Sequence, residues 1–191
     1  MLRSITIGFI LAIVSGTLAA PAPEEKKVDY QKLADETIWD WPEEKASLTY
    51  SYEHYKGKFE IEIQASSLEG GFRDSLVKFK NADGKEFFSI TGHNGTVFVE
   101  NKNILYYADF CPISTGCTLI AYDLQARKRV WKVKLKGAGP VDHSKYHNAV
   151  VLYLKEGGIC VQGNESYGRY VEFVDIKTGN TVGHKKFKEK R

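Results

Sequence analysis

Cysteine is scarce in this chain, since only three occur among 191 residues. That number is too small for the disulfide scaffold on which small secreted domains rely. Helical periodicity is nearly absent, which argues against an α-helical core. Metal-ligand clusters, phosphate-binding glycine loops and convincing nucleophile systems are lacking as well. The sequence therefore indicates no catalytic residue, no metal site and no cofactor.

Long apolar runs are missing except at the beginning of the chain. Arg3 precedes an apolar core at residues 5–12, and small residues follow. This pattern predicts a cleaved signal peptide over residues 1–20. A membrane anchor is the competing interpretation, but the apolar stretch 5–20 is short for a span of about 20 residues and contains glycine and serine. We therefore expect a secreted, extracellular protein with no membrane span after processing.

The mature chain is long enough for one hydrophobic core but not for two. Residues 21–62 hold eleven acidic residues against six lysines, whereas the full chain has a formal net charge of +3. The sequence thus divides into an acidic leader at residues 21–46, a β-repeat domain at residues 47–187 and a basic tail at residues 188–191. One short helix is predicted within the leader, at residues 29–36.

Short runs of tyrosine, phenylalanine, valine and isoleucine alternate with glycine, asparagine and aspartate turns in the repeat domain. Apolar and polar residues alternate in segments 59–63 and 131–136, so one face of each strand is buried and the other is wet. This pattern predicts an all-β fold. Twelve strands are expected in three groups of four, centred near Leu48, Phe59, Leu76 and Phe87; near Val97, Leu105, Leu119 and Val130; and near Val150, Ile159, Val171 and Val182.

The second half of each group repeats one pattern, a strand, a charged turn and a strand. The three copies occupy residues 75–88, 119–131 and 171–182. Their equivalent turn positions are Lys80, Asp123 and Asp175, which are separated by 43 and 52 residues. This spacing is close to the roughly 40 to 50 residues of a four-stranded propeller blade.

Two of the turns carry a motif that resembles a known repeat. The second copy contains Ala121, Asp123 and Trp131, and the third contains Asp175, Thr178 and Gly179. Together they resemble the Ala-x-Asp-x-x-Thr-Gly-x-x-x-Trp repeat of the quinoprotein-like, or pyrroloquinoline-quinone-type, β-propellers. The copies depart from it where Ala126 and Arg127 replace Thr-Gly and where Gly183 stands in the tryptophan position. The resemblance implies four-stranded antiparallel blades, with Trp131 packed between neighbouring blades.

Three blades are too few for the usual ring, which needs about four to eight. The sequence therefore predicts an incomplete or half propeller. The family's enzymes hold quinone and metal in the funnel of a full ring, so no cofactor-binding residue is carried over. Three arrangements would protect the outer sheets. The leader with Trp39 and Trp41 packs over one end, two chains join as a homodimer, or the three sheets form a compact sandwich.

The cysteines are unevenly placed. Cys111 and Cys117 bracket a five-residue loop between predicted strands at residues 104–109 and 118–123. If these strands form a hairpin, a disulfide clamps its open end, and we predict that bridge. Cys160 lies in an apolar strand and is predicted to be a buried thiol.

Asn94 and Asn164 begin Asn-x-Ser/Thr triplets in predicted loops. In a eukaryotic host these triplets predict solvent-facing glycosylation sites.

His143 and His147 are four residues apart. This spacing suits a metal ion only on a helix, and the preceding Gly-Ala-Gly-Pro segment at residues 137–140 argues against one. The alternative function is a secreted hydrolase in which these histidines and nearby acids converge at the repeat ends.

Positive charge concentrates on one predicted strand and its turn. We name this group the basic strip; its members are Arg127, Lys128, Arg129, Lys132, Lys134 and Lys136. Exposed lysines protect a strand edge from pairing, which is one interpretation. The other is a binding site for an acidic polysaccharide or an acidic protein, with no nucleic-acid partner expected. The resulting hypothesis is a secreted, non-catalytic binding or interaction module.

Overall fold

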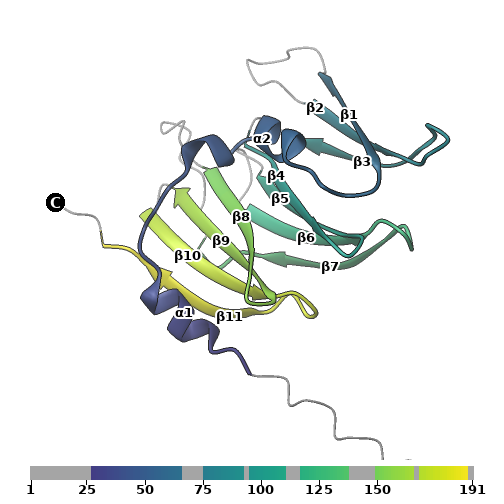
Figure 1. The fold of residues 1–191 in the computed structure, drawn as a ribbon. Coiled ribbons are helices and arrows are strands. Elements are labelled where there is room, and N and C mark those ends of the chain that lie inside the picture. The colour runs from purple at the N-terminus through teal and green to yellow at the C-terminus, as the bar shows by residue number, and fades with distance from the viewer. Residues whose placement is uncertain are drawn as a thin grey trace, which may run out of the picture.

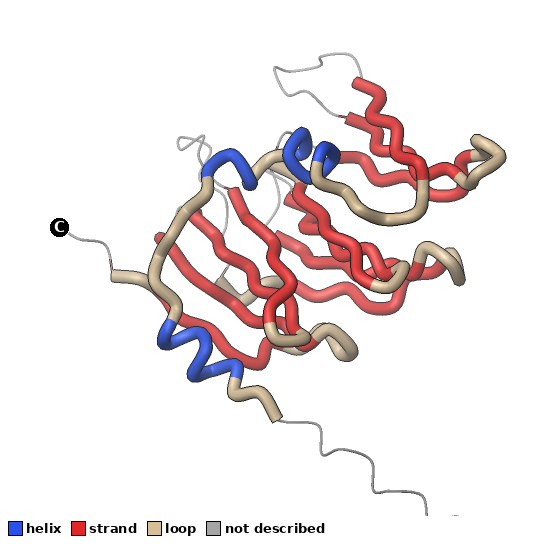
Figure 2. Tube along the Cα trace, viewed as in Figure 1, coloured by secondary structure: helices blue, strands red, loops and turns tan. Residues whose placement is uncertain are grey.

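The computed structural model describes residues 27–65, 75–92, 95–110, 117–137, 149–165 and 168–188. These residues form mainly β-structure, in three antiparallel sheets of three or four strands with few helices (Figures 1 and 2). The sequence-based prediction of a β-rich chain with a short helix in the leader is therefore confirmed.

The strands follow the chain sheet by sheet. The first sheet contains β1 (Glu60–Ala65), β2 (Ser75–Lys80) and β3 (Glu86–Gly92). The second contains β4 (Val97–Asn101), β5 (Ile104–Phe110), β6 (Cys117–Asp123) and β7 (Lys128–Lys134). The third contains β8 (Ala149–Lys155), β9 (Gly158–Glu165), β10 (Gly168–Asp175) and β11 (Thr181–Lys186). Within each sheet, strands that are consecutive in the sequence are hydrogen-bonded neighbours, so each sheet is an antiparallel meander.

A helix replaces the strand predicted near Leu48. This helix, α2 (Leu48–Glu53), begins after Ser47, whose Oγ accepts a hydrogen bond from a backbone N–H of the first turn at 3.1 Å. Ser51 Oγ accepts a further hydrogen bond from Phe98 N of β4 at 3.1 Å. The strand prediction is wrong here because serine hydroxyls cap the helix and fix it to β4, and the first sheet has three strands.

The predicted leader helix is present as α1 (Tyr30–Glu36). Asp29 caps it, since its Oδ1 accepts a hydrogen bond from Lys32 N at 3.0 Å. The helix lies against the third sheet (Figure 1). Leu33 and the fully buried Ala34 pack on the outer face of that sheet. The residues beneath the helix are Cys160, Val171 and Phe173.

The leader continues along this side of the molecule beyond α1. The Trp39 ring stacks on the Trp41 ring and also contacts the Phe187 ring, both with centroids 5.3 Å apart. The Arg169 guanidinium lies 5.5 Å over Trp39. A short 3₁₀ helix, η1 (Glu43–Lys45), then leads into α2. The leader therefore covers one end of the sheets, as the first of the three expected arrangements requires.

Two apolar cores lie between the three sheets. Leu119 and Ala121 of β6 face Val150 and Val161 of the third sheet. Phe98 and Leu105, together with Phe79 of the first sheet, form the other core and are at most 3% exposed. Alternate residues of one strand point to opposite faces, so the second sheet is the middle layer. The first strands of the second and third sheets, β4 and β8, lie against each other.

Trp131 of β7 connects the second sheet to the third. Its Nε1–H donates a hydrogen bond to Ile176 O at 3.2 Å, in the turn after β10. The ring also lies against Tyr106, with centroids 5.9 Å apart. At Gly179 of the same turn, a Cβ atom would come within 2.8 Å of the Trp131 ring. Trp131 therefore packs between consecutive sheets.

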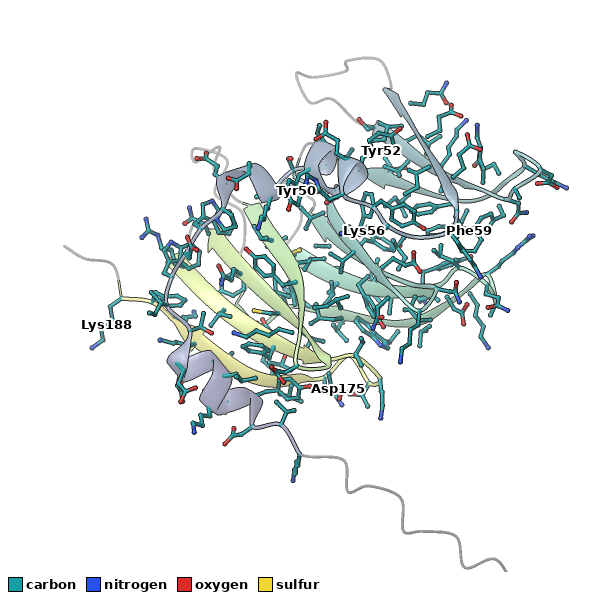
Figure 3. All side chains as sticks on the ribbon, viewed as in Figure 1. Tyr50, Tyr52, Lys56, Phe59, Asp175 and Lys188 are labelled. Atoms are coloured by element: carbon teal, nitrogen blue, oxygen red, sulfur yellow. The ribbon has the colours of Figure 1, made fainter. Side chains whose placement is uncertain are left out.

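The turns after β6 and β10 share one geometry. Asp123 and Asp175 end these strands, and the Oδ1 atom of each accepts two backbone hydrogen bonds of 2.7 to 3.1 Å from the turn. Asp175 is labelled in Figure 3. When the aspartate is counted as the first residue, the fifth residue of each turn has a positive φ, 55° at Arg127 and 75° at Gly179. Arg127 thus adopts the left-handed conformation that glycine favours.

Burial by itself would raise the pKa of the Asp175 carboxyl. Hydrogen bonds from the Thr178 hydroxyl and from the turn backbone outweigh the effect of burial, so the pKa of Asp175 is lowered. The carboxylate of this turn is therefore held in its charged form.

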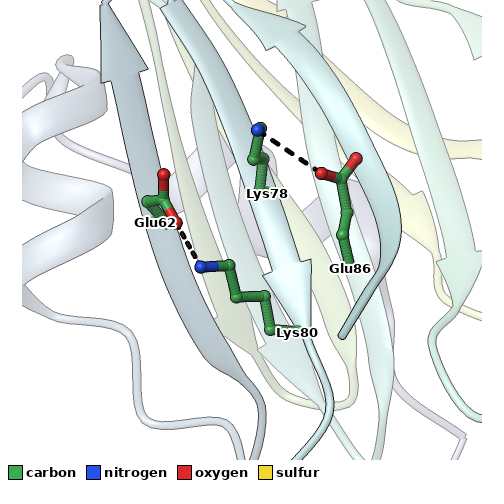
Figure 4. A network of polar contacts seen from close by, with 4 residues as sticks. All are labelled: Glu62, Lys78, Lys80 and Glu86. Atoms are coloured by element: carbon green, nitrogen blue, oxygen red, sulfur yellow. Dashed lines mark hydrogen bonds and ion pairs between the residues drawn. The ribbon is translucent and has the colours of Figure 1, made fainter. Parts of the chain in front are cut away.

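The outer face of the first sheet is charged (Figure 4). Lys80 forms an ion pair with Glu62, and Lys78 Nζ lies 3.5 Å from a Glu86 carboxylate oxygen. Lys80 aligns with the turn aspartates in the sequence, but it binds a neighbouring strand instead of capping its turn. The stack of sheets is therefore bounded by a charged face on one side and by α1 on the other.

Candidate functional site

The basic strip lies on and around β7, at one edge of the second sheet. Among the described residues the strand order is β4-β5-β6-β7, so within them β7 has a hydrogen-bonded strand on one side only. All six side chains of the strip are exposed. Lys132 and Lys134 alternate with the half-buried Trp131 and Val133, so the two lysines share the face opposite the tryptophan.

The cations of the strip have no acidic partner in the part of the chain that the structure describes. Ion pairs there join Lys32 to Glu36, Lys78 to Glu86 and Lys80 to Glu62. Arg127 is the one strip member with a ring contact within those residues, since its guanidinium lies 5.1 Å over Phe87. The positive charge of the strip is therefore directed to solvent.

A buried carboxylate fixes the end of the strip. Glu172 of β10 is fully buried and accepts hydrogen bonds from Lys136 N at 3.1 Å and from Gly137 N at 3.0 Å. The Thr181 hydroxyl donates to the same carboxylate. Because these bonds use the backbone of Lys136, its ammonium group remains exposed. The backbone at the end of the strip is therefore hydrogen-bonded to the third sheet.

Several predicted site residues lie outside the described residues. They are Asn94, Cys111, His143 and His147, together with the predicted signal peptide at residues 1–20. The disulfide and the histidine-based hydrolase site therefore stay predictions. Cys117, the other half of the predicted bridge, is fully buried at the start of β6.

Asn164 lies in β9 rather than in a loop, which corrects its predicted position. It pairs in register with Ala149 and Arg169, because the β9–β10 hairpin extends to Glu165 and Gly168. Its side chain is half-buried. Glycosylation of Asn164 stays a prediction.

Cys160 is confirmed as a buried thiol, with 3% of the residue exposed. Burial raises the pKa of this thiol to about 12. A thiol that resists ionisation is a poor nucleophile, so Cys160 has a packing role beneath α1.

Across the described ranges, no three His, Cys, Asp or Glu side chains are grouped so that they could hold a metal ion. Within the same ranges, none of the helices has the length and apolar character needed to cross a membrane.

A cavity of about 340 Å³ opens between α2, β4 and β8. Its apolar surface comes from β4 and β8 and includes Val97, Val99, Val151 and Leu152. Its lining also includes Tyr50, His54, Tyr55 and Tyr153, with Lys45, Lys56 and Glu100 as charged members. Tyr50 and Lys56 are labelled in Figure 3.

The aromatic side of the cavity is ordered by ring and cation contacts. The Tyr50 and His54 rings stack with centroids 3.8 Å apart. Lys45 Nζ lies 5.9 Å from the Tyr50 ring centroid and 5.8 Å from that of Tyr153. This ammonium thus bridges α2 and β8 through two cation–π contacts.

A second group of polar atoms lies where the cavity meets the end of β4. Glu100 Oε1 accepts a hydrogen bond from Asn103 N at 2.9 Å. Glu100 Oε2 and Tyr55 Oη are buried side by side, and the phenol forms a hydrogen bond with the carboxylate. Burial, then the charge of Glu100 and the hydrogen bond to its carboxylate, raise the pKa of Tyr55 well above its usual value. The environment therefore favours the neutral phenol over the phenolate.

This cavity has no signal in the sequence, because the residue pattern predicts a strand near Leu48. In a strand, Tyr50 and His54 point to one face but lie far apart along it. In a helix, residues four apart are neighbours on one face. Ser47 ahead of this segment was the available signal for a helix start.

No family model matches the chain, and no curated protein matches it either.

Proposed function

We propose that this protein is a secreted, non-catalytic binding module built from propeller-like blades, and that it binds an acidic partner through the basic strip on β7. The observation that carries the proposal is the set of six exposed cations on one strand edge, none of which has an acidic partner among the described residues. Clustered charge of one sign attracts ligands of the opposite sign and accelerates their association.

Several features support the propeller-like part of the proposal. Each sheet is a sequential meander, and the first strands β4 and β8 lie together. Trp131 packs between two sheets, as the resemblance to quinoprotein-like repeats implies. The shared geometry of the Asp123 and Asp175 turns supports the alignment of the second and third repeats.

Retention on a dextran sulfate column tests the binding site. The variant Lys132→Gln, Lys134→Gln and Lys136→Gln removes three cations of the strip and leaves the backbone bonds to Glu172 available. We expect retention to be lost, while the melting temperature stays nearly unchanged because exposed charges contribute only about 0 to 1 kcal/mol to stability. Retention of the unmodified protein should fall steeply with added salt.

A second triple variant provides the matched control. Lys102→Gln, Lys155→Gln and Lys186→Gln remove the same charge from exposed positions outside β7. This variant should keep most of its retention. Equal loss in both variants would show that net charge rather than the strip determines binding, and full retention by the first variant would exclude the strip as the site.

A further inference from the structure

The cavity between α2, β4 and β8 has the size and the lining of a small-molecule site, and it shares no residue with the basic strip. Ligand pockets combine an apolar lining with a few convergent polar groups, and volumes of about 300 to 1,000 Å³ are usual. This cavity measures about 340 Å³. Leu154 in its lining is 42% exposed, so part of the apolar surface is open to solvent. The cavity can therefore hold a molecule about the size of one ring with a short side chain.

The acidic residue of the lining is engaged from within the protein. Tyr55 donates a hydrogen bond to the Glu100 carboxylate, and burial covers both Tyr55 Oη and Glu100 Oε2. The other carboxylate oxygen accepts a hydrogen bond from Asn103 N at 2.9 Å. Glu100 therefore has its donors already and does not call for a ligand.

The two lysines of the lining have no comparable partner. Lys45 and Lys56 form no ion pair within the part of the chain that the structure describes. Lys45 Nζ lies over the rings of Tyr50 and Tyr153, which attract a cation but carry no full negative charge. Two lysines against one glutamate leave the lining with an excess of positive charge.

Lys45 is the stronger anion-binding group of the two lysines. It is half-buried, and a charge beside apolar and aromatic groups is screened less than a charge surrounded by water. Lys56 is exposed, so its attraction for an anion is weaker. Hydrogen bonds between an ammonium group and a carboxylate are about twice as strong as neutral ones. A carboxylate attached to an apolar body therefore matches both parts of the lining.

We propose that this cavity binds a small organic acid, a carboxylate on an apolar body about one ring in size. The carboxylate accepts a hydrogen bond from the Lys45 ammonium group, and the apolar body packs against the valine and leucine side chains of β4 and β8. The proposal does not rest on the basic strip, so either proposal stands without the other.

Isothermal titration with three ligands that share a phenyl ring tests the charge preference. Phenylacetate carries a carboxylate, 2-phenylethanol a hydroxyl and 2-phenylethylamine an ammonium group. Phenylacetate should bind at least about tenfold more tightly than the other two. The Lys45→Gln variant should lose this preference. Lys45→Arg keeps the charge and the ability to lie over the two rings, so it should keep most of the affinity for phenylacetate.

Two control variants separate the cavity from charge elsewhere on the protein. Lys58→Gln removes a cation that also lies over a ring, 5.3 Å from the Phe59 centroid, but does not line the cavity. Lys132→Gln with Lys134→Gln and Lys136→Gln neutralises three cations of the basic strip. Both variants should bind phenylacetate as the unmodified protein does, whatever the strip variant does on dextran sulfate.

Each other outcome overturns the proposal. Equal affinity for the three ligands would show that the apolar surface alone binds, and tighter binding of the amine would show that Glu100 determines the preference. Equal losses in Lys45→Gln and Lys58→Gln would trace the effect to net charge. Loss of phenylacetate binding in the strip variant would place the carboxylate on the basic strip. Absence of binding at millimolar phenylacetate would show that the cavity is not a site for small organic acids.

Discussion

Gly84 and Gly179 have the same positive φ of 75° but different surroundings. A Cβ at Gly84 would meet no atom within 4 Å, whereas at Gly179 it would lie 2.8 Å from the Trp131 ring and 3.0 Å from Val133. Substitutions at the two glycines therefore distinguish the free-energy cost of an unfavourable backbone conformation from the cost of overpacking between sheets.

Replacing each glycine with alanine measures these two costs. Gly84→Ala should destabilise the protein by about 1 kcal/mol, since an L-residue is strained at this φ. Gly179→Ala should cost about 1 to 3 kcal/mol more, because the added methyl group overpacks the contact with Trp131. Urea unfolding of both variants gives the difference. Equal losses would mean that the turn moves away from Trp131 without cost.

At the scale of elements, strand positions were predictable from local composition. Runs of β-branched and aromatic residues between turn residues located eleven of the twelve expected strands. Alternation of polar and apolar residues marks β1 and β7 in addition, because each buries one face. The strand prediction near Leu48 was wrong because the helix formed there is held by a hydrogen bond from Phe98 N, which is distant in the sequence. The cavity was not predictable for the same reason, since it exists only where α2 meets β4 and β8.

Coverage of the third sheet by α1 makes a second prediction. Ala34 is fully buried against Cys160 and Phe173, so Ala34→Arg should detach the helix and expose this thiol. Alkylation of Cys160 by iodoacetamide, followed by peptide mass mapping, should become much faster. Glu36→Arg places the same side chain on the exposed face of α1 and should leave the rate unchanged. An unchanged rate in Ala34→Arg would show that the helix does not protect Cys160.

At the scale of the whole molecule, the two outer faces of the stack of sheets differ in how they meet their surroundings. The third sheet buries its outer apolar residues under α1, Trp39 and Phe187. The first sheet instead presents the charged network of Glu62, Lys78, Lys80 and Glu86 to solvent (Figure 4). Polar outer faces keep terminal units of stacked architectures soluble. We therefore expect this network to prevent a further sheet from packing on this face.

Removing that charge should cause self-association rather than unfolding. In the variant Lys78→Val with Glu86→Val, the strands keep good β-formers and lose an ion pair worth about 0 to 1 kcal/mol, so the folded chain should remain stable. The new apolar patch should then drive association, detected by sedimentation velocity at increasing concentration. The exchange Lys78→Glu with Glu86→Lys keeps the face polar and should sediment as the unmodified protein does. If the valine variant also sediments unchanged, the charged network does not limit the stack, and the shape of this face prevents packing instead.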